Sequence, residues 1–369
     1  MNAGLPDIEA IVRPFEIEGR IADAGIFGSG HINDTFLLRT RDADPYDYLL
    51  QRINHHIFKN VGALQENIER VTTHIRKKLA AIPGANPDRE VLTLVRCKDG
   101  TTYSRDAGGS TWRVYLFIDG TRSYDIVDSP ARAYEGGRAF GRFQAMLADL
   151  PGPPLHDTIP RFHDIDFRLD NFADALRRDP LHRAASIRDE IAFVEHRADE
   201  MRTIKRLGAE GRIPLRITHN DTKFNNVLLD ENDRALCVTD LDTVMNGYVH
   251  YDFGDSIRTS TNTGAEDEAD LDKVSMDINL FEGYARGFLE ETGPFLNPVE
   301  IDHLAFSGRL LTYIIGLRFF TDHLDGDHYF KIHAEGHNLR RARAQFKLLR
   351  SMEEQAEDMR AVIDRLRPY

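Results

Sequence analysis

Two short runs near the middle of the chain, joined by a polar turn, constrain the fold more than any other feature. The first run, THNDTKFNNVLL, occupies residues 218–229, and the second, ALCVTDLDTV, occupies residues 235–244. Apolar residues end the first run and begin the second, with the polar sequence DENDR between them. This pattern predicts a β-hairpin, which returns Asp240 toward Asn226.

The polar residues beside this hairpin have the spacing of a phosphotransfer site. His219 is followed by Asp221 and Asn226 in the pattern His-x-Asp-x-x-x-x-Asn. A carboxylate at Asp221 orients or deprotonates a substrate hydroxyl, and Asn226 and Asp240 supply oxygen ligands for Mg²⁺. Each residue alone fits a polar turn or a strand end. Together they predict phosphate transfer from a nucleotide to a hydroxyl, with Asp221 both catalytic and in contact with the acceptor.

A second acidic motif follows closely and competes for the metal role. The sequence YDFG at 251–254 contains the letters of the protein-kinase metal motif. Asp240 comes earlier and fits the hairpin better. We expect Asp252 instead to stabilise the next segment by capping a helix near Ser256.

HNDTKFNN together with VTDLD resembles the aminoglycoside phosphotransferase and choline kinase branch of the protein-kinase-like superfamily. The sequence is more similar still to N-acetylhexosamine 1-kinases. Five segments carry this likeness: GSGHINDTF at 28–36, YLLQRIN at 48–54, ENIERVTTHI at 66–75, HNDTKFNN at 219–226 and GLRFFTDHLDGDHYFK at 316–331. The resemblance implies a bilobal α+β kinase-like fold, and ATP- and Mg²⁺-dependent phosphorylation of the anomeric hydroxyl of N-acetylglucosamine or N-acetylgalactosamine.

The first third of the chain is rich in strand patterns and the remainder in helical ones. Three strand-like segments precede an amphipathic helix over 60–80, and strands are expected again over 90–96 and 112–118. This is the order of a kinase N-terminal lobe. We expect a nucleotide-binding lobe over 1–118 and a catalytic, substrate-binding lobe over 119–369.

The loop between the first two strands, GSGHIND, contains two glycines whose backbone can approach phosphate groups. Alone it fits an ordinary hairpin turn. The catalytic pattern downstream favours nucleotide contacts here, with His31 also directed to the sugar. The expected nucleotide-binding residues are Gly28, Ser29, Gly30, His31 and Asn33.

The third strand lacks the lysine with which protein kinases hold the α and β phosphates. LLQRIN offers Gln51 and Arg52 instead. We expect Arg52 to bind the phosphates and to pair with Glu66 on the following helix. Glu69 is the alternative acid and Lys59 a further cation.

Adenine is expected at the strand that joins the lobes. Backbone groups over 117–119, chiefly those of Phe117 and Ile118, are expected to read its edge. Ile53, Leu116 and Leu228 are candidate apolar walls, although each fits simple core packing equally well.

The second lobe has the pattern of a mainly helical structure. Helices are expected around 140–147 and over 187–204, 270–291, 298–325 and 337–367. Arg318 lies among apolar residues in one of them, so its charge needs an oxygen-rich partner. The resemblance implies that this partner is the sugar, and an ion pair with Asp322 is the alternative.

Composition limits the remaining function classes. The formal net charge of −13 disfavours nucleic-acid binding, and no apolar run approaches the length of roughly 20 residues that crosses a bilayer. Cys97 and Cys237, in apolar runs, are expected to be buried thiols. We expect a cytoplasmic monomer or small homo-oligomer with ATP, Mg²⁺ and a small sugar as ligands. A kinase for an aminoglycoside, choline or homoserine, and a non-catalytic nucleotide-binding module, are the alternatives.

Overall fold

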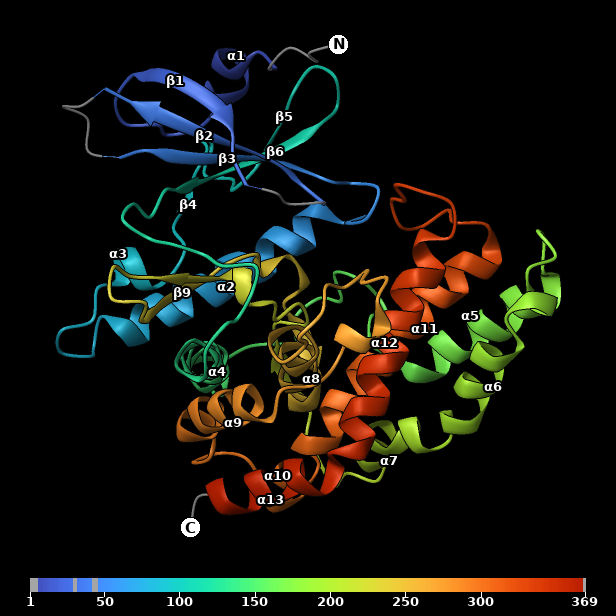
Figure 1. The fold of residues 1–369 in the computed structure, drawn as a ribbon. Coiled ribbons are helices and arrows are strands. Elements are labelled where there is room, and N and C mark those ends of the chain that lie inside the picture. The colour runs from blue at the N-terminus through green and yellow to red at the C-terminus, as the bar shows by residue number, and fades with distance from the viewer. Residues whose placement is uncertain (1–5, 29–31, 42–45, 368–369) are drawn as a thin grey trace.

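The computed structural model describes residues 6–28, 32–41 and 46–367. An antiparallel sheet forms the N-terminal part and lies above a larger helical part in Figure 1. The order across the sheet is β1-β2-β3-β6-β4, and β5 also pairs with β6. The strands are β1 (Ile21–Ile26), β2 (Asp34–Thr40), β3 (Tyr48–Ile53), β4 (Leu94–Val95), β5 (Ser104–Arg105) and β6 (Thr111–Leu116). The three strands expected first are confirmed.

The two faces of the sheet pack against different partners, because side chains alternate along each strand. Leu50 and Trp112 belong to a cluster that includes the short helix α1 (Ile8–Val12). On the opposite face, Tyr115 packs with α2 (Val61–Leu79). Both faces are therefore apolar, and the inward-facing positions are those that approach α2.

Helix α2 contacts both the sheet and the helical part. Its first turn is capped by the Asn60 side chain, which accepts from the Ala63 N–H. Asn67 Nδ2 donates to the carbonyls of His156 at 2.8 Å and Val244 at 3.1 Å, both in the helical part. All six apolar residues of the expected stripe are buried: Val61, Leu64, Ile68, Val71, Ile75 and Leu79.

The strand expected over 90–96 is mostly absent. The chain instead forms a helical turn, α3 (Pro87–Glu90), followed by the two-residue strand β4. Asn86 caps this turn through a bond from the Asp88 N–H, and a proline occupies its first position, where a missing N–H costs nothing.

The helical part is built around α11, most of whose residues are buried. Its helices are α4 (Pro130–Leu147), α5 (Ile165–Arg178), α6 (Arg188–Arg197), α7 (Thr203–Ala209), α8 (Val249–Ser260), α9 (Ile278–Thr292), α10 (Pro298–Asp302), α11 (Leu304–Asp325), α12 (His337–Glu354) and α13 (Ala356–Leu366). Among the helices of the described residues, none is long and apolar enough to cross a membrane.

Several expected long helices are divided. The pattern over 187–204 forms α6, a 3₁₀ turn and α7, although its apolar stripe remains largely buried. The helix expected from 270 starts at Ile278, because Asp277 caps it by accepting from the Asn279 and Leu280 N–H groups. Breaks at His303 and Gln355 separate α10 from α11 and α12 from α13.

Helices α4 and α9 cross in direct backbone contact. A Cβ on Gly137 would lie 2.1 Å from the Tyr284 carbonyl oxygen, and a Cβ on Gly287 would lie 2.1 Å from the Tyr134 carbonyl oxygen. Only glycine fits at such a distance, so these two positions set the separation of the helices.

Two small antiparallel ladders carry the central motif. Strand β7 (Arg216–Thr218) pairs with β10 (Met245–Gly247), and β8 (Val227–Leu229) pairs with β9 (Ala235–Val238). Arg122, which belongs to no strand, also forms an antiparallel bridge with Leu229 of β8. The expected hairpin is therefore confirmed, with the catalytic pattern between β7 and β8.

Candidate active site

The loop over residues 219–226, between β7 and β8, carries the predicted catalytic residue Asp221 and is named the catalytic loop for that prediction. A carboxylate from α8 fixes its backbone. Asp252 Oδ2 accepts from the His219 N–H and Oδ1 from the Asn220 N–H, each at 2.8 Å. Gln144 Nε2 on α4 also donates to Asp252 Oδ2 at 2.6 Å. The expectation that Asp252 caps a helix near Ser256 is wrong. Helix α8 already begins at Val249, so Asp252 lies inside it and faces the loop.

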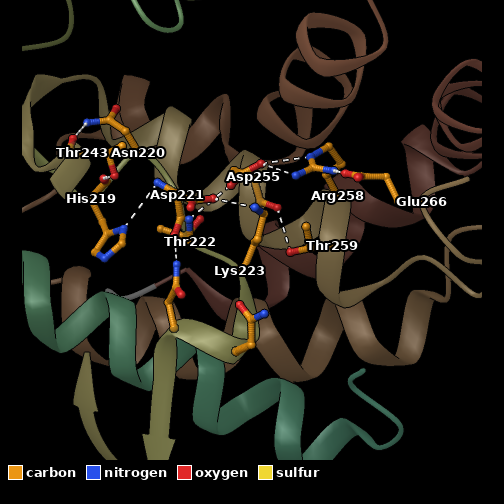
Figure 2. A network of polar contacts seen from close by, with 12 residues as sticks. His219, Asn220, Asp221, Thr222, Lys223, Thr243, Asp255, Arg258, Thr259 and Glu266 are labelled. Carbon is orange, nitrogen blue, oxygen red and sulfur yellow. Dashed lines mark hydrogen bonds and ion pairs between the residues drawn. The ribbon is translucent and has the colours of Figure 1, made fainter. Parts of the chain in front are cut away.

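A second acid of α8 fixes Thr222, the residue after Asp221 (Figure 2). Asp255 Oδ2 accepts from the Thr222 N–H at 3.1 Å. Thr222 Oγ1 donates to the Asp252 carbonyl at 2.7 Å. The buried Arg258 guanidinium lies between Asp255 and Glu266, so Asp255 does not stand as an isolated buried charge. His219 and Asn220, which precede Asp221, and Thr222, which follows it, are thus held on one helix.

His219 joins the catalytic loop to the strand that leads to Asp240. Its Nε2 lies 2.8 Å from the Thr239 carbonyl oxygen, and its Nδ1 accepts from the Asp221 N–H at 3.3 Å. These partners assign a neutral imidazole with its hydrogen on Nε2. Phe140 and Phe143 contact the ring edge-on, with centroids 5.4 and 5.7 Å away, and hold its orientation.

Asn226 is oriented by the loop that it ends. Its Nδ2 donates to the Asp221 carbonyl at 2.8 Å, which leaves Oδ1 as the acceptor available to a cation. The Thr239 N–H donates to the Asn226 carbonyl at 2.8 Å and closes the hairpin. Asp240 follows in the left-handed conformation, with φ of 55°. The hairpin thus returns Asp240 to the end of the loop that carries Asp221 and Asn226.

The carboxylates of this group repel one another. The Asp240 side chain is exposed, but neighbouring protein atoms displace part of the water around its carboxyl. This desolvation, and then the charges of Asp242 and Asp221, raise the pKa of the carboxyl. Burial opposes ionisation of Asp221 as well, but the surrounding positive groups, first among them the Lys223 ammonium 3.3 Å from Oδ1, together lower its pKa. Lys223 lies between Asp221 and Asp255 in Figure 2.

This donor set fits a divalent cation. Hard cations such as Mg²⁺ prefer oxygen ligands and commonly take one or two from the protein, with phosphate and water completing the shell. Asn226 Oδ1 and the Asp240 carboxylate are such a pair, and a cation would relieve the repulsion at Asp240. Within the described residues no group of three or more His, Cys, Asp or Glu side chains forms a metal site, so an all-protein cage is not found there.

The expected pair of Arg52 and Glu66 is wrong. Arg52 lies on the outer face of the sheet over the Trp112 ring and pairs with Asp34. Glu66 contacts His156 Nε2 at 3.0 Å. The alternation of β3 turns Gln51 inward and therefore turns Arg52 away. The two other candidates, Glu69, which pairs with Arg96, and the exposed Lys59, do not replace them.

Arg113 supplies the buried cation that the third strand lacks. It lies on β6 directly opposite Gln51, and its Nε donates to Gln51 Oε1 at 2.9 Å. Its guanidinium pairs with Asp242, which is 2% exposed, and this pairing raises the pKa of Arg113 against the effect of burial. Asn33 Nδ2 donates to Asp242 Oδ2 at 2.6 Å. The sequence signal for this group is an arginine in the apolar strand WRVYL.

Of the residues in the GSGHIND loop that are predicted to contact the nucleotide, the structure describes only Gly28 and Asn33. Gly28 has φ of 75° and is exposed beside the loop, whereas Ser29, Gly30 and His31 lie outside the described residues. The Asn33 side chain contacts Asp242, one of the carboxylates whose charge acts on Asp240.

At the interlobe strand, some of the expected adenine contacts are already used. The Phe117 N–H donates to the Asp47 carbonyl at 2.9 Å, and the Ile118 carbonyl accepts from Thr121 Oγ1 at 2.9 Å. Within the described chain, the Ile118 N–H and the Phe117 carbonyl have no hydrogen-bond partner. Of the expected apolar walls, Ile53 is a core residue, while Leu116 and Leu228 are half-buried.

Arg318 lies on α11 among aromatic rings. Its guanidinium carbon is 5.1 Å from the Phe162 ring centroid and 5.5 Å from that of Phe330. The alternative ion pair with Asp322 is not formed, because Asp322 accepts the N–H groups of 328–330. Among the described residues, no carboxylate pairs with Arg318.

The segment before α5 connects Arg318 to the catalytic loop. His163 follows Phe162, and its Nε2 lies 3.0 Å from the Asn220 carbonyl oxygen. Burial lowers the pKa of His163 to about 4, and the nearby Arg318 and Arg168 charges act in the same direction. Burial, and then the charge of Arg318, lower the pKa of Arg168 to about 9. Two arginines thus lie near the residue that precedes Asp221.

Known structures share this fold at low sequence identity. An aminoglycoside phosphotransferase from Alicyclobacillus acidocaldarius superposes with a TM-score of 0.62 at 14% identity, covering 97% of this chain and 98% of that one. Choline kinase from Cryptosporidium parvum gives 0.55 at 14% identity, covering 91% and 90%. Amicoumacin kinase, solved with AMP-PNP, Ca²⁺ and Ami, gives 0.55 at 11%, covering 92% and 89%.

These likenesses establish the bilobal kinase-like α+β fold. A family model described as the phosphotransferase enzyme family matches residues 23–288 of the chain, which include the sheet except for the first two residues of β1, and the catalytic loop with its supporting helix α8. The chain therefore belongs to the phosphotransferase enzyme family.

Proposed function

We propose that the protein transfers the terminal phosphate of ATP to the anomeric hydroxyl of an N-acetylhexosamine. The observation that carries the phosphotransfer is the grouping of Asp221 with Asn226 and Asp240 through the hairpin and His219. The resemblance of GLRFFTDHLDGDHYFK to N-acetylhexosamine 1-kinases supports the acceptor class. Amicoumacin kinase, which binds AMP-PNP with a divalent cation, supports the choice of ATP and Mg²⁺.

The residues of the chain divide the work of transfer. Asp221 accepts a hydrogen bond from the acceptor hydroxyl and aligns its oxygen with the phosphate. Lys223, beside Asp221, offers an ammonium to the transferring phosphate oxygens. Asn226 and Asp240 would hold Mg²⁺, which neutralises phosphate charge when bound. Arg113 pairs with Asp242 and orients it near this group.

The charges near the acceptor side favour a neutral, oxygen-rich molecule. Arg318 has no carboxylate partner among the described residues, and Arg168 lies close enough to be perturbed by its charge. Two arginines repel the quaternary ammonium of choline and the amines of an aminoglycoside but donate to hydroxyl and N-acetyl oxygens. The exposed Tyr329 ring, 5.8 Å from the Arg318 guanidinium carbon, adds an apolar face for a sugar ring.

An acceptor panel tests the proposal. With ATP and Mg²⁺, phosphorus NMR should show a phosphate coupled to the anomeric proton for N-acetylglucosamine or N-acetylgalactosamine, and weaker turnover of glucosamine. Faster turnover of choline, homoserine or an aminoglycoside would assign one of the alternative acceptors. Binding of Mg²⁺-ATP without transfer to any of these alcohols would favour the regulatory module.

Arg318→Met separates acceptor binding from nucleotide binding. Loss of a charged hydrogen-bond donor to the sugar should raise KM for the N-acetylhexosamine by about tenfold or more and leave KM for ATP unchanged. Arg343→Met serves as the control. Arg343 lies on the neighbouring helix α12, is half-exposed and pairs with Glu190 of α6. An unchanged sugar KM in Arg318→Met would remove Arg318 from the acceptor site.

A further inference from the structure

Asn220, the residue immediately before Asp221, has an uncommon backbone conformation for a residue with a side chain. Its φ is 65°, in the left-handed region that glycine adopts most readily. Asparagine tolerates this region better than most residues, but glycine adopts it at lower cost. The backbone conformation alone therefore does not account for an asparagine here. Its side chain, in a residue only 3% exposed, needs a separate explanation.

The Asn220 amide joins the catalytic loop to the segment that follows Asp240 (Figure 2). Nδ2 donates to the Thr243 carbonyl oxygen at 2.9 Å and to the Thr218 carbonyl oxygen at 3.2 Å. Oδ1 accepts from Thr218 Oγ1 at 3.1 Å. Thr218 ends β7, and Thr243 ends a 3₁₀ turn that begins directly after Asp240. One buried amide thus connects two segments that are distant in the sequence.

Asp240 lies between two residues that the catalytic loop binds. On its N-terminal side, His219 Nε2 contacts the Thr239 carbonyl oxygen at 2.8 Å. On its C-terminal side, Thr243 is bound twice, by Asn220 Nδ2 and through its own Oγ1, which donates to the His219 carbonyl at 2.7 Å. The Asp240 side chain itself is exposed. The place of its carboxylate relative to the catalytic loop therefore depends on the bonds to its neighbours.

We infer that Asn220 is a positioning residue, which places Asp240 for Mg²⁺ by holding Thr243 on the catalytic loop. Residues that orient metal ligands without touching the metal are commonly worth about 10- to 100-fold in metal affinity or activity. The inference rests on the proposed roles of Asp221 and Asp240 in phosphotransfer, but it is independent of which alcohol is the acceptor.

Asn220→Gly removes the amide and leaves the backbone of the loop supported. The Asn220 N–H donates to Asp252 Oδ1, and its carbonyl oxygen lies 3.0 Å from His163 Nε2. Neither bond involves the Asn220 side chain. Glycine also adopts the left-handed conformation without strain. The variant should therefore fold and lose only the bonds of the amide, including the one to Thr243.

Hydrogen exchange followed by mass spectrometry tests this connection without metal or nucleotide. In Asn220→Gly, the backbone amides over 240–244 should exchange severalfold faster than in the wild type, because the turn has lost a bond to the loop. His182→Gly is the matched control. His182 is exposed and also left-handed, with φ of 53°, so its replacement should leave exchange over 240–244 unchanged.

Affinity for AMP-PNP tests the consequence for the cation. The full chain is titrated by calorimetry, once with Mg²⁺ at saturation and once with EDTA. Mg²⁺ should strengthen binding to the wild type, and in Asn220→Gly this gain should be smaller by about tenfold. Affinity without metal should stay the same. General loosening of the site would lower both affinities, so the split distinguishes positioning from a structural role.

Thr243→Val removes the second bond between the same segments. Its loss of the hydroxyl that donates to the His219 carbonyl should also reduce the gain from Mg²⁺. Thr292→Val is the control, because Thr292 is a buried threonine of α9 whose hydroxyl donates to the Phe288 carbonyl at 2.8 Å. It should leave the gain from Mg²⁺ unchanged.

The outcomes separate this inference from the proposed acceptor. Wild-type exchange over 240–244 in Asn220→Gly, or an equal loss of affinity with and without Mg²⁺, would overturn the inference. A wild type whose affinity for AMP-PNP is independent of Mg²⁺ would overturn the proposed metal site and this inference with it. The expected exchange and affinity changes in a protein that phosphorylates no N-acetylhexosamine would support the inference and contradict only the acceptor.

Discussion

At the scale of single residues, the charge of Asp221 is the centre of the proposed chemistry. Asp221→Asn keeps the shape of the side chain but removes its ability to accept the hydroxyl proton, and kcat should fall by about 10²- to 10⁴-fold. Affinity for AMP-PNP, measured by calorimetry, should change little. Asp170→Asn on the exposed surface of α5 is the control. Near-normal turnover in Asp221→Asn would exclude the assigned role.

Arg113 and Asp242 form a buried pair whose loss can be measured as stability. Both side chains are at most 3% exposed, so removing the arginine leaves an uncompensated carboxylate. Arg113→Met should lower the free energy of unfolding by about 3–5 kcal/mol in urea titration. Adding Asp242→Asn should recover part of this loss. A single variant as stable as the wild type, or a double variant less stable than the single one, would contradict the pairing.

The sequence could not identify Arg113 because both faces of the sheet are apolar. In YLLQRI the adjacent residues Leu49 and Leu50 are equally hydrophobic, so periodicity alone leaves open whether Gln51 or Arg52 faces inward. Only the packing of Leu50 with the α1 side of the sheet decides it. The cation then comes from the neighbouring strand, a relation that depends on strand pairing and not on local spacing.

At the scale of elements, the hairpin was predictable, whereas the helix that supports the loop before it was not. Polar turn residues between two apolar runs define β8 and β9 directly. Helix α8 has the sequence VHYDFGDSIRTS, in which the acids Asp252 and Asp255 are buried along with the apolar residues. Its carboxylates are buried because they satisfy loop N–H groups that are far away in the sequence. Such partners cannot be found from a local pattern.

The crossing of α4 and α9 gives a prediction at this scale. Gly137→Ala places a Cβ against the backbone of Tyr284, which cannot move aside as a flexible side chain does. The free energy of unfolding should fall by about 1–3 kcal/mol or more. Gly62→Ala on α2, where the nearest atom is 3.5 Å from the added Cβ, should instead leave stability unchanged or increase it by up to about 1 kcal/mol. Equal effects in urea titration would refute the close crossing.

At the scale of the whole molecule, buried neutral histidines should make stability depend on pH. Burial lowers the pKa of His163 to about 4, below its usual 6.5, so protons bind the unfolded chain more readily. The stability present above pH 6.5 is therefore lost as the pH falls toward 4. Between pH 7 and 5 this residue should account for about 2 kcal/mol.

His163→Gln isolates that contribution. Glutamine keeps a donor for the Asn220 carbonyl but does not titrate. Its unfolding free energy, measured in urea at pH 7 and pH 5, should fall less than that of the wild type by about 2 kcal/mol. The buried His250 stays in both proteins and serves as an internal reference. An identical pH dependence would show that His163 does not titrate as its surroundings indicate.

The overall order of strands and helices could be predicted because composition changes along the chain from strand-like to helical. The boundaries were less accessible. Caps at Asp277 and breaks at His303 and Gln355 depend on how neighbouring helices meet. The resemblance identified the family, but the acceptor depends on side chains such as Arg318, whose partners are set by three-dimensional contacts.

The bonds of Asn67 constrain how the lobes can move relative to one another. They tie the middle of α2 to the carbonyls of His156 and Val244, which belong to the helical part. A rigid rotation of the sheet must either rupture these two bonds or leave α2 in place. If α2 stays, the sheet moves across a stationary helix, so binding of the proposed nucleotide would change the spacing between β3 and α2 instead of moving both as one body.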